Sequence, residues 1–123
     1  MNKILEHKHI IIRAEVSDPI TKRNKAIKFL NKIIKAIGMK AMYGPTATYC
    51  KMLGNRGVTA FAIIETSHIA LHIWDEVNPA LVQLDVYSCS DFEPKKVLDI
   101  LQELKPTKVE HKYLDREKGF KEL

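Results

Sequence analysis

Apolar residues recur at a helical spacing between residues 20 and 37. The intervals of three, four and seven residues place these side chains on one face of a helix. The members of this stripe are Ile20, Ile27, Leu30, Ile34 and Ile37. Asp18 can cap the helix with Pro19 at its first position, and Gly38 can end it because glycine tolerates a positive φ. The pattern therefore predicts an amphipathic helix between Asp18 and Gly38.

A second apolar stripe predicts a shorter helix over about residues 92–104. Its members are Val97, Leu98, Leu101 and Leu104. Ser90 and Glu93 have the spacing of a capping box, in which each side chain accepts a free backbone N–H of the first turn. Pro106 ends the helix, because proline cannot continue its hydrogen bonds.

Runs of Ile, Val and other β-prone residues predict strands over residues 5–16, 39–50, 58–66, 68–74, 80–88 and about 107–114. Gly44-Pro45 breaks the second run, residues 54–57 form a turn, and Asn78-Pro79 separates two later strands. The resulting order is β-α-β-β-β-β-α-β. Because a run of strands separates the helices, we predict one α+β domain over residues 1–123, a two-layer sandwich with an antiparallel sheet and two helices on one face.

The composition of the 123 residues fits one globular domain, since 46% are apolar and 28% are charged. No run of 18 apolar residues is present, and Lys3, Glu6 and Lys8 interrupt the stretch where a signal peptide needs apolar residues. We therefore expect a cytoplasmic protein with no membrane partner. The two cysteines, Cys50 and Cys89, are too few for a disulfide framework, so each is a buried small side chain or a reactive thiol.

The formal net charge of +5 raises the question of nucleic-acid binding. Much of the excess lies in residues 22–40, where seven Lys and Arg residues face no acidic residue. The same segment is the predicted amphipathic helix, so we interpret its charge as a solvated helix face rather than a phosphate-binding patch. Aromatic residues interleaved with the lysines, which single-strand binders need, are nearly absent. We expect no nucleic-acid partner.

Reactive side chains gather on one face of the predicted strand 68–74. His68, His72 and Trp74 share that face, while Ile and Leu residues occupy the other and suit the core. Two helices cover the Ile and Leu face better than the histidine face. This uncovered face predicts a homodimer or a dimer of dimers, with the active site at a subunit interface.

Two chemical interpretations of this region fit its residues less well. A metal site could draw on His68, His72, Asp75 and Glu76, with His7 and His9 as further ligands. However, residues four apart on a strand have Cα atoms about 13 Å apart, too far for both imidazoles to reach one ion, so we expect no metal. A serine or cysteine hydrolase would need a nucleophile on a strained turn, and no G-x-S-x-G elbow is present.

Two short stretches carry a resemblance to a known family. Residues 66–76 read TSHIALHIWDE and residues 84–89 read LDVYSC. They resemble the patterns E-S-H-x-x-x-H-T-W-P-E and V-D-x-F-T-C of the small prokaryotic S-adenosylmethionine decarboxylases. The match covers Ser67, His68, His72, Trp74, Glu76, Asp85 and Cys89 together. Gly57-Val58 and the closing Val109-Glu110-His111 also look like the family's, so the similarity of layout covers most of the chain.

The resemblance implies a pyruvoyl enzyme that makes its own cofactor. In the family a serine attacks the preceding carbonyl, and the resulting ester breaks down to a pyruvoyl group while the chain is cut in two. Carried over, the bond is Thr66–Ser67, the fragments are residues 1–66 (beta chain) and 67–123 (alpha chain), and the pyruvoyl group derives from Ser67. His72 matches the histidine that assists the elimination, and Thr59 falls where the family has a serine that aids processing.

The resemblance also implies a substrate, S-adenosylmethionine, which is decarboxylated to the aminopropyl donor for spermidine. Cys89 matches the acid that reprotonates the carbon left by CO2. Glu76 matches the carboxylate that binds the ribose hydroxyls, and Leu53 falls where bacterial enzymes have a ring that stacks on adenine. His68 and Trp74 complete the expected substrate-binding set.

Departures from the family's pattern keep other functions open. Thr66 stands where the family has Glu, Asp75 where it has Pro, and Ile73 where it has Thr. One alternative is a homologue that does not process and acts as a binding or regulatory partner, and another is a pyruvoyl decarboxylase of a different amino acid. Read singly, Ser67 also fits a strand-end hydroxyl, the histidines half-buried sheet residues and the cysteine a small core side chain.

Overall fold

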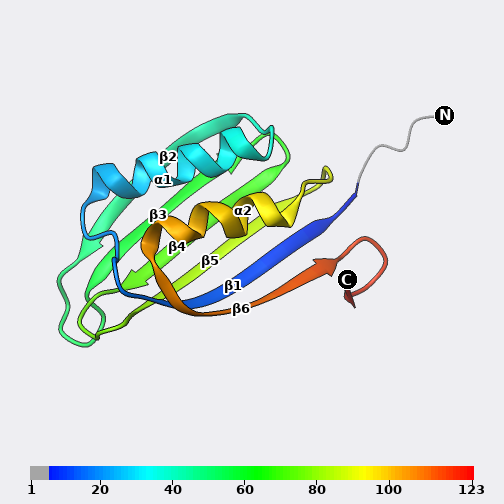
Figure 1. Cartoon of the computed structure of the whole chain (residues 1–123). Coiled ribbons are helices and arrows are strands. Elements are labelled where there is room, and N and C mark those ends of the chain that lie inside the picture. The colour runs from blue at the N-terminus through cyan, green and yellow to red at the C-terminus, as the bar shows by residue number, and fades with distance from the viewer. Residues whose placement is uncertain (1–5) are drawn as a thin grey trace.

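The computed structural model describes residues 6–123, which form a seven-stranded antiparallel sheet with two α-helices on one face (Figure 1). The strands lie in the order β2-β3-β4-β5-β1-β6-β7. They are β1 (Lys8–Val16), β2 (Ala41–Cys50), β3 (Gly57–Ile64), β4 (Ser67–Trp74), β5 (Ala80–Ser88), β6 (Pro106–Asp115) and β7 (Lys121–Glu122). The helices are α1 (Arg23–Ala36) and α2 (Pro94–Leu101), which the 3-10 turn η1 (Gln102–Leu104) extends. The predicted α+β two-layer sandwich is confirmed, and β7 is a short addition to it.

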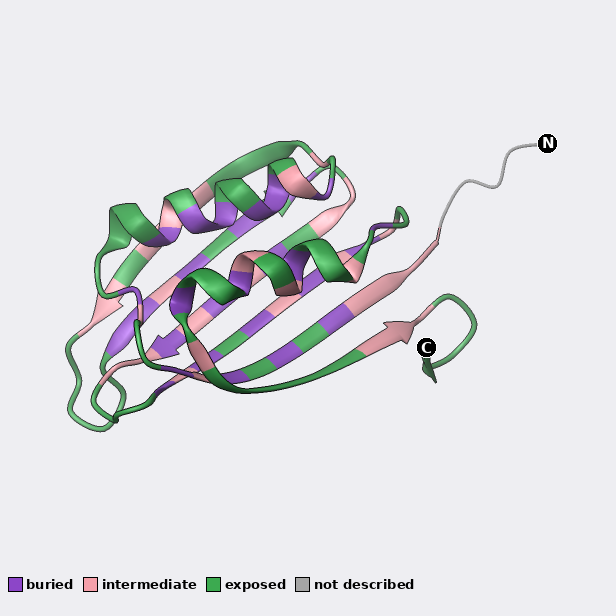
Figure 2. Cartoon of the chain, in the orientation of Figure 1, coloured by how far each residue is buried: buried purple, intermediate pink, exposed green. Residues whose placement is uncertain are grey.

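The core lies between the helices and one face of the sheet. In β1 the buried side chains alternate along the strand, and they are Ile10, Ile12, Ala14 and Val16. From α1 the fully buried residues include Leu30 and Ile33, and Figure 2 shows the buried positions of both helices on the sides that face the sheet. Burying each such side chain contributes about 1.5–3 kcal/mol. The same alternation leaves the opposite face of the sheet without a helical cover.

The first helix begins later than the sequence predicts. The start predicted from Asp18 and Pro19 is wrong, because α1 begins at Arg23 after Lys22, which makes no side-chain cap hydrogen bond. The N–H of Asp18 instead donates to the carbonyl oxygen of Leu104 at 3.0 Å. This hydrogen bond holds the segment before α1 against η1, which follows α2. The backbone of Asp18 is therefore used in a tertiary contact, and α1 begins five residues later.

The end of α1 agrees with the sequence-based prediction, whereas the start of α2 agrees with it only in part. Gly38 has a φ of +73° and follows the end of α1, as predicted. The predicted capping box is wrong, because Glu93 precedes α2 without a side-chain hydrogen bond and the N–H of Ser90 donates to Ser88 Oγ. Pro94, which lacks an N–H, opens α2 instead.

The strands deviate from their predicted bounds mainly at their ends. The expected start at residue 5 lies outside the described residues, and β1 begins at Lys8. The predicted break at Gly44-Pro45 is confirmed as a shift of register between Tyr43 and Thr46. Among residues 6–123, no helix is long and apolar enough to cross a membrane.

Candidate active site

A two-residue hairpin turn contains the candidate cleavage bond. Ile64 of β3 pairs with Ser67 of β4, so Glu65 and Thr66 form the turn between the strands. Ser67 has a φ of +153°, a backbone conformation that residues with a side chain rarely adopt. A residue held there stores about 1–3 kcal/mol of strain. The strained dihedral therefore directly adjoins the Thr66–Ser67 peptide bond.

The carbonyl group of the same bond is held by the backbone of Cys89. The N–H of Cys89 donates to the carbonyl oxygen of Thr66 at 2.6 Å, and Ser67 pairs with Ser88 across β4 and β5. A donor aimed at a carbonyl oxygen stabilises negative charge that develops there. Cys89 is a half-buried free cysteine. The structure thus brings Thr66, Ser67 and Cys89 together at one end of β4.

A second group lies at the other end of β4. Thr59 and His72 are direct partners across β3 and β4, and Thr59 Oγ1 lies 3.2 Å from His72 Nδ1. The imidazole stacks on the ring of Trp74, with ring centroids 6.0 Å apart. Trp74 in turn donates its Nε1–H to Asn55 Oδ1 at 2.7 Å. These contacts join the end of β4 to the loop that precedes β3.

Glu76 anchors that loop, which spans residues 51–56. Glu76 Oε1 accepts the N–H groups of Gly54 and Arg56 at 2.8 and 2.9 Å. The loop presents Leu53, whose side chain is 82% exposed. The structure therefore groups Glu76 and Leu53 with Trp74 and His72. Sequence reasoning missed that the Glu76 carboxylate also holds the turn, although the glycine at position 54 was a signal for a turn there.

The two groups are far apart within one chain. His72 lies five residues along β4 from Ser67, which corresponds to about 16 Å. A group that takes a proton must come within about 3 Å of the atom that carries it. One chain alone therefore separates residues that the resemblance assigns to a single site.

A third group lies on the open sheet face. The sequence grouped its His9 and His68 only as possible ligands of a metal site with His72, and it did not predict their contacts with Asp85 and Arg116. His9 Nε2 donates to Asp85 Oδ2 at 2.9 Å, and His68 Nε2 lies 3.4 Å from the same oxygen. Arg116 Nη1 donates to His9 Nδ1 at 3.1 Å, and the Arg116 guanidinium lies 4.3 Å from the centroid of the Tyr87 ring. We call these five residues the His9 network. Their proximity depends on β1 pairing with β5, which the sequence pattern does not reveal.

The charge of Asp85 follows from its neighbours in this network. Burial acts to raise the pKa of the Asp85 carboxyl, but the hydrogen bond and charge of His9, together with His68, outweigh burial and hold the pKa below its ordinary value. Asp85 is therefore a carboxylate at neutral pH.

Asp75, which stands where the family has proline, has a structural use in this chain. Its N–H donates to the carbonyl oxygen of Arg56 at 3.1 Å, and its Oδ2 accepts from the hydroxyl of Tyr49 at 2.8 Å. The hydrogen bond to Asp75 raises the pKa of Tyr49. Because proline has no N–H to donate, this departure adds a contact between the end of β4 and loop 51–56.

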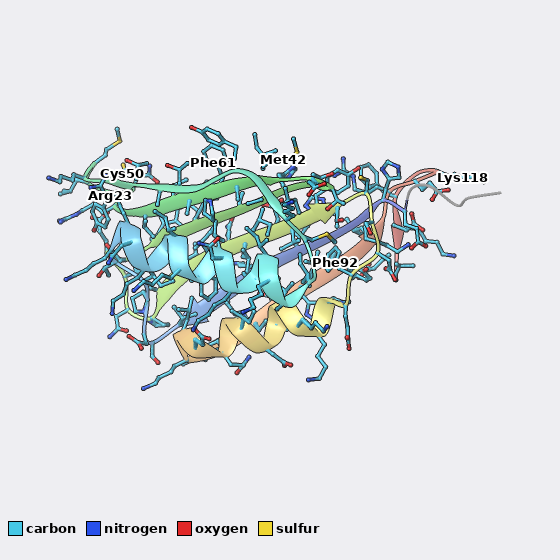
Figure 3. The ribbon with its side chains drawn as sticks, turned by 90° about the horizontal axis from the view of Figure 1, so that it is seen from above. Arg23, Met42, Cys50, Phe61, Phe92 and Lys118 are labelled. Atoms are coloured by element: carbon cyan, nitrogen blue, oxygen red, sulfur yellow. The ribbon has the colours of Figure 1, made fainter. Side chains whose placement is uncertain are left out.

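The open face of the sheet also carries exposed apolar side chains. Figure 3 shows Phe61 and Met42 on the side of the sheet away from α1 and α2. The side chain of Phe61 is 41% exposed, Ile63 is similarly exposed, and Tyr43 stacks on Phe61 with ring centroids 6.1 Å apart. Exposed apolar area beside polar candidate residues is typical of a surface that another protein covers.

A cleft of about 540 Å³ lies on the helix side instead, between residues 18–22, α1 and η1. Its lining is rich in lysine, and Lys32 pairs with Glu103 at 2.9 Å. Because its walls belong to the helix layer, this cleft contains none of the candidate residues of β4 and β5.

Comparison with known proteins identifies the family. The sequence model of the S-adenosylmethionine decarboxylase family matches residues 8–117. The chain is 40% identical to the S-adenosylmethionine decarboxylase proenzyme of Pyrobaculum islandicum over 108 residues, covering 86% of this chain and 76% of the relative. It is 39% identical to that of Pyrobaculum neutrophilum over 99 residues, covering 79% and 70%.

A solved structure supports the fold independently. The adenosylmethionine decarboxylase from Aquifex aeolicus VF5 matches with a TM-score of 0.69 and 24% identity, covering 91% of each chain. The predicted resemblance is thus confirmed by sequence over most of the chain, and the sandwich architecture is confirmed by structure. This chain belongs to the S-adenosylmethionine decarboxylase family.

Proposed function

We propose that this chain is a pyruvoyl-dependent S-adenosylmethionine decarboxylase that cuts itself at the Thr66–Ser67 bond and supplies the aminopropyl donor for spermidine. One observation carries the proposal. Ser67 has a φ of +153°, and the carbonyl oxygen of the preceding residue, Thr66, accepts the N–H of Cys89 at 2.6 Å. Strain in a dihedral next to a peptide bond favours a reaction that breaks this bond and thereby relieves the strain. The names of the relatives, which are proenzymes, support a chain that is made as a precursor.

The cut begins when Ser67 Oγ attacks the carbonyl carbon of Thr66. The hydroxyl proton passes to the amide nitrogen, and an ester replaces the amide. Negative charge develops on the Thr66 oxygen during the attack, and the N–H of Cys89 stabilises it from 2.6 Å. In other enzymes the loss of one such donor costs about 10²–10³-fold in rate. The strained backbone and the bound carbonyl thus favour the same step.

The second stage removes the α-proton of Ser67 and expels the Thr66 carboxylate. Water then converts the resulting dehydroalanine into a pyruvoyl group and releases ammonia. The α-proton needs a base, and His72, held by Thr59 at 3.2 Å, is our candidate. Two groups of the chain suit the formation of a pyruvoyl group at this position. They are the hydroxyl of Ser67 next to the turn and the backbone N–H of Cys89.

In turnover, the pyruvoyl group would supply a ketone as the sink for the electron pair left on the substrate carbon when CO2 departs. The chain's own residues bind substrate and move one proton. The Cys89 thiol returns the proton to carbon, and Glu76 holds the ribose hydroxyls. Leu53 offers an exposed apolar contact to adenine in place of a stacked ring. His68 and Trp74 complete the binding surface.

Each complete site forms between two subunits in this proposal. Ser67 and Cys89 lie at one end of β4, and Thr59, His72 and Glu76 lie at the other. A two-fold axis through the open sheet face would bring one end of β4 against the opposite end of the partner's β4. The exposed Phe61 and Ile63 on that face supply apolar area for the contact. The proposed oligomer is therefore a homodimer with two sites.

The two fragments stay together after the cut. β1 belongs to the fragment 1–66, and it pairs with β5 and β6 of the fragment 67–123. β3 also remains paired with β4. Cleavage therefore opens the hairpin turn without breaking the sheet.

The test compares the intact mass of the purified wild-type chain with that of Ser67→Ala. We expect the wild type to give fragments 1–66 and 67–123, the second with a pyruvoyl end, and to release CO2 from S-adenosylmethionine. Ser67→Ala stays at full mass, and the matched variant Ser90→Ala is cut like the wild type. A wild type of full mass would contradict self-processing and favour a binding or regulatory homologue, and a cut at any other bond would refute the assignment of Ser67.

A further inference from the structure

Three metal-binding atoms converge on the open sheet face within the His9 network. One ring nitrogen of His9, one of His68 and an oxygen of Asp85 lie within 4.8 Å of one another. The proposed function gives His9 and Asp85 no role, and it uses His68 only as part of the substrate-binding surface. Their arrangement therefore requires a separate explanation.

The strand register fixes these three side chains. His68 and His9 lie on either side of Tyr87, in one row across β4, β5 and β1. Asp85 lies two residues before Tyr87 on β5, so its side chain shares the same face. Ligands held on three neighbouring strands of one sheet keep their positions better than ligands on loops.

The distances suit a small divalent ion. The two nitrogen-to-oxygen distances are 2.9 Å from His9 and 3.4 Å from His68. Ligand atoms about 2.0–2.1 Å from a tetrahedral zinc ion lie about 3.3 Å from one another. An ion therefore needs only small changes in the distances from Asp85 to the two imidazoles. Two imidazoles and a carboxylate leave a coordination position for water, the ligand set of open zinc sites and of related transition-metal sites.

Arg116 opposes an ion at this position. It donates to His9 Nδ1, so the proton of His9 lies on Nε2 and points at Asp85. A metal on Nε2 moves that proton to Nδ1, which then faces the Arg116 donor. Binding therefore requires Arg116 to leave, and its positive charge repels the ion until it does.

We propose that His9, His68 and Asp85 form a binding site for a divalent transition metal, with Arg116 as its competitor. Zn²⁺ and Co²⁺ are the class of ion that this ligand set takes. The site stands on the geometry of the sheet, and it does not depend on self-processing or on decarboxylation.

The test is a calorimetric titration of the full chain, free of any affinity tag, with Zn²⁺ and with Co²⁺. We expect one ion per chain. Asp85→Asn and His9→Ala each remove a direct ligand of the ion. Mutation of a residue that only orients a ligand lowers metal affinity by about 10–100-fold, so we expect each of these two variants to lose more than that. His7→Ala and Cys50→Ser are matched controls, since both remove a metal-binding side chain outside the three ligands, and we expect them to bind like the wild type.

Arg116→Met separates this site from incidental metal binding. It keeps the apolar stem, removes the charge and frees His9 Nδ1, so we expect at least about tenfold tighter binding. Zn²⁺ should also raise the melting temperature of the wild type and of Arg116→Met but not that of Asp85→Asn. Binding that survives Asp85→Asn, or the absence of saturable binding in both the wild type and Arg116→Met, would overturn the proposal.

Discussion

The backbone of Ser67 differs from that of its neighbours in β4, and this difference can be measured without activity. Ser67→Gly and Ser67→Ala both lack the hydroxyl, so we expect both to stay uncut. In an ordinary strand glycine is less stable than alanine by about 0.5–1 kcal/mol. At a φ of +153° the order reverses, because glycine adopts this conformation without strain. We expect Ser67→Gly to unfold in urea with a free energy about 1 kcal/mol higher than Ser67→Ala. If Ser67→Ala is the more stable, the turn stores no strain.

Cys89 contributes two groups to the proposed mechanism, its backbone N–H and its thiol, and a substitution can remove the thiol alone. Cys89→Ala keeps the N–H that holds the Thr66 carbonyl but removes the thiol, so the variant should still be cut. Turnover per pyruvoyl group should fall by about 10²–10⁴-fold, the usual contribution of a general acid. CO2 release in the wild type, Cys89→Ala and the control Cys50→Ala measures this. Equal rates in all three would remove the Cys89 thiol from the mechanism.

Among the elements, apolar spacing predicted the helices and strands, whereas hydrogen-bond partners decided their ends. The stripe from Ile27 to Ile37 needs only local periodicity to be recognised. The start of α1 depends on Asp18 bonding to Leu104, a contact between residues distant in sequence. The local sequence around Asp18 does not indicate that Leu104 is its hydrogen-bond partner. A helix cap was therefore predicted at a position where a tertiary contact forms.

Loop 51–56 is held to the end of β4 by one carboxylate oxygen, which gives a prediction at the scale of an element. Glu76→Ala removes the acceptor of the Gly54 and Arg56 N–H groups. A hydrogen bond to a charged acceptor contributes about 1.5–3 kcal/mol, and less when it is exposed. A loss of about 1.4 kcal/mol corresponds to a factor of ten, so we expect the hydrogen-exchange rate of these two amides to rise by about tenfold.

The matched variant is Glu76→Gln, which retains an oxygen at the same place and should keep most of the protection. The amide of Asp75, which bonds to the Arg56 carbonyl, reports on the same loop. Unchanged exchange in Glu76→Ala would show that the loop holds its shape without the carboxylate.

At the scale of the whole molecule, the site could be predicted only in part from the sequence. Residues 66–76 carry Ser67, His72 and Glu76 in one stretch, and this continuity made the family recognisable. The same continuity places Ser67 and His72 on one extended strand, where five residues span about 16 Å, and Glu76 just beyond its end. The His9 network shows the opposite case. His9 lies on β1, and Arg116 follows β6, and only the sheet order brings these two residues next to His68 and Asp85 of β4 and β5.

Pairing two inactive variants tests whether each site draws on two subunits. We expect Ser67→Ala to stay uncut, and we expect His72→Ala to be slow at the elimination step and to accumulate an ester that hydroxylamine splits. In a mixed dimer one site combines both changes, and the other combines an intact Ser67 from one chain with the partner subunit's intact His72. Random pairing on co-expression therefore restores about a quarter of all sites, so about a quarter of the chains should be cut.

The extent of cutting is read from the intact masses of the co-expressed mixture, with each variant expressed alone as its control. If one chain contained the whole site, the mixture would show no more pyruvoyl-ended fragment than the two controls together. The same outcome would follow if the protein were a monomer, and sedimentation of the wild type at micromolar concentration separates these two cases. If the pyruvoyl-ended fragment appears in the mixture and the wild type sediments as a dimer, His72 acts on the hairpin turn of the partner subunit, held in place by Thr59 at 3.2 Å. Each open sheet face would then complete the site of the other.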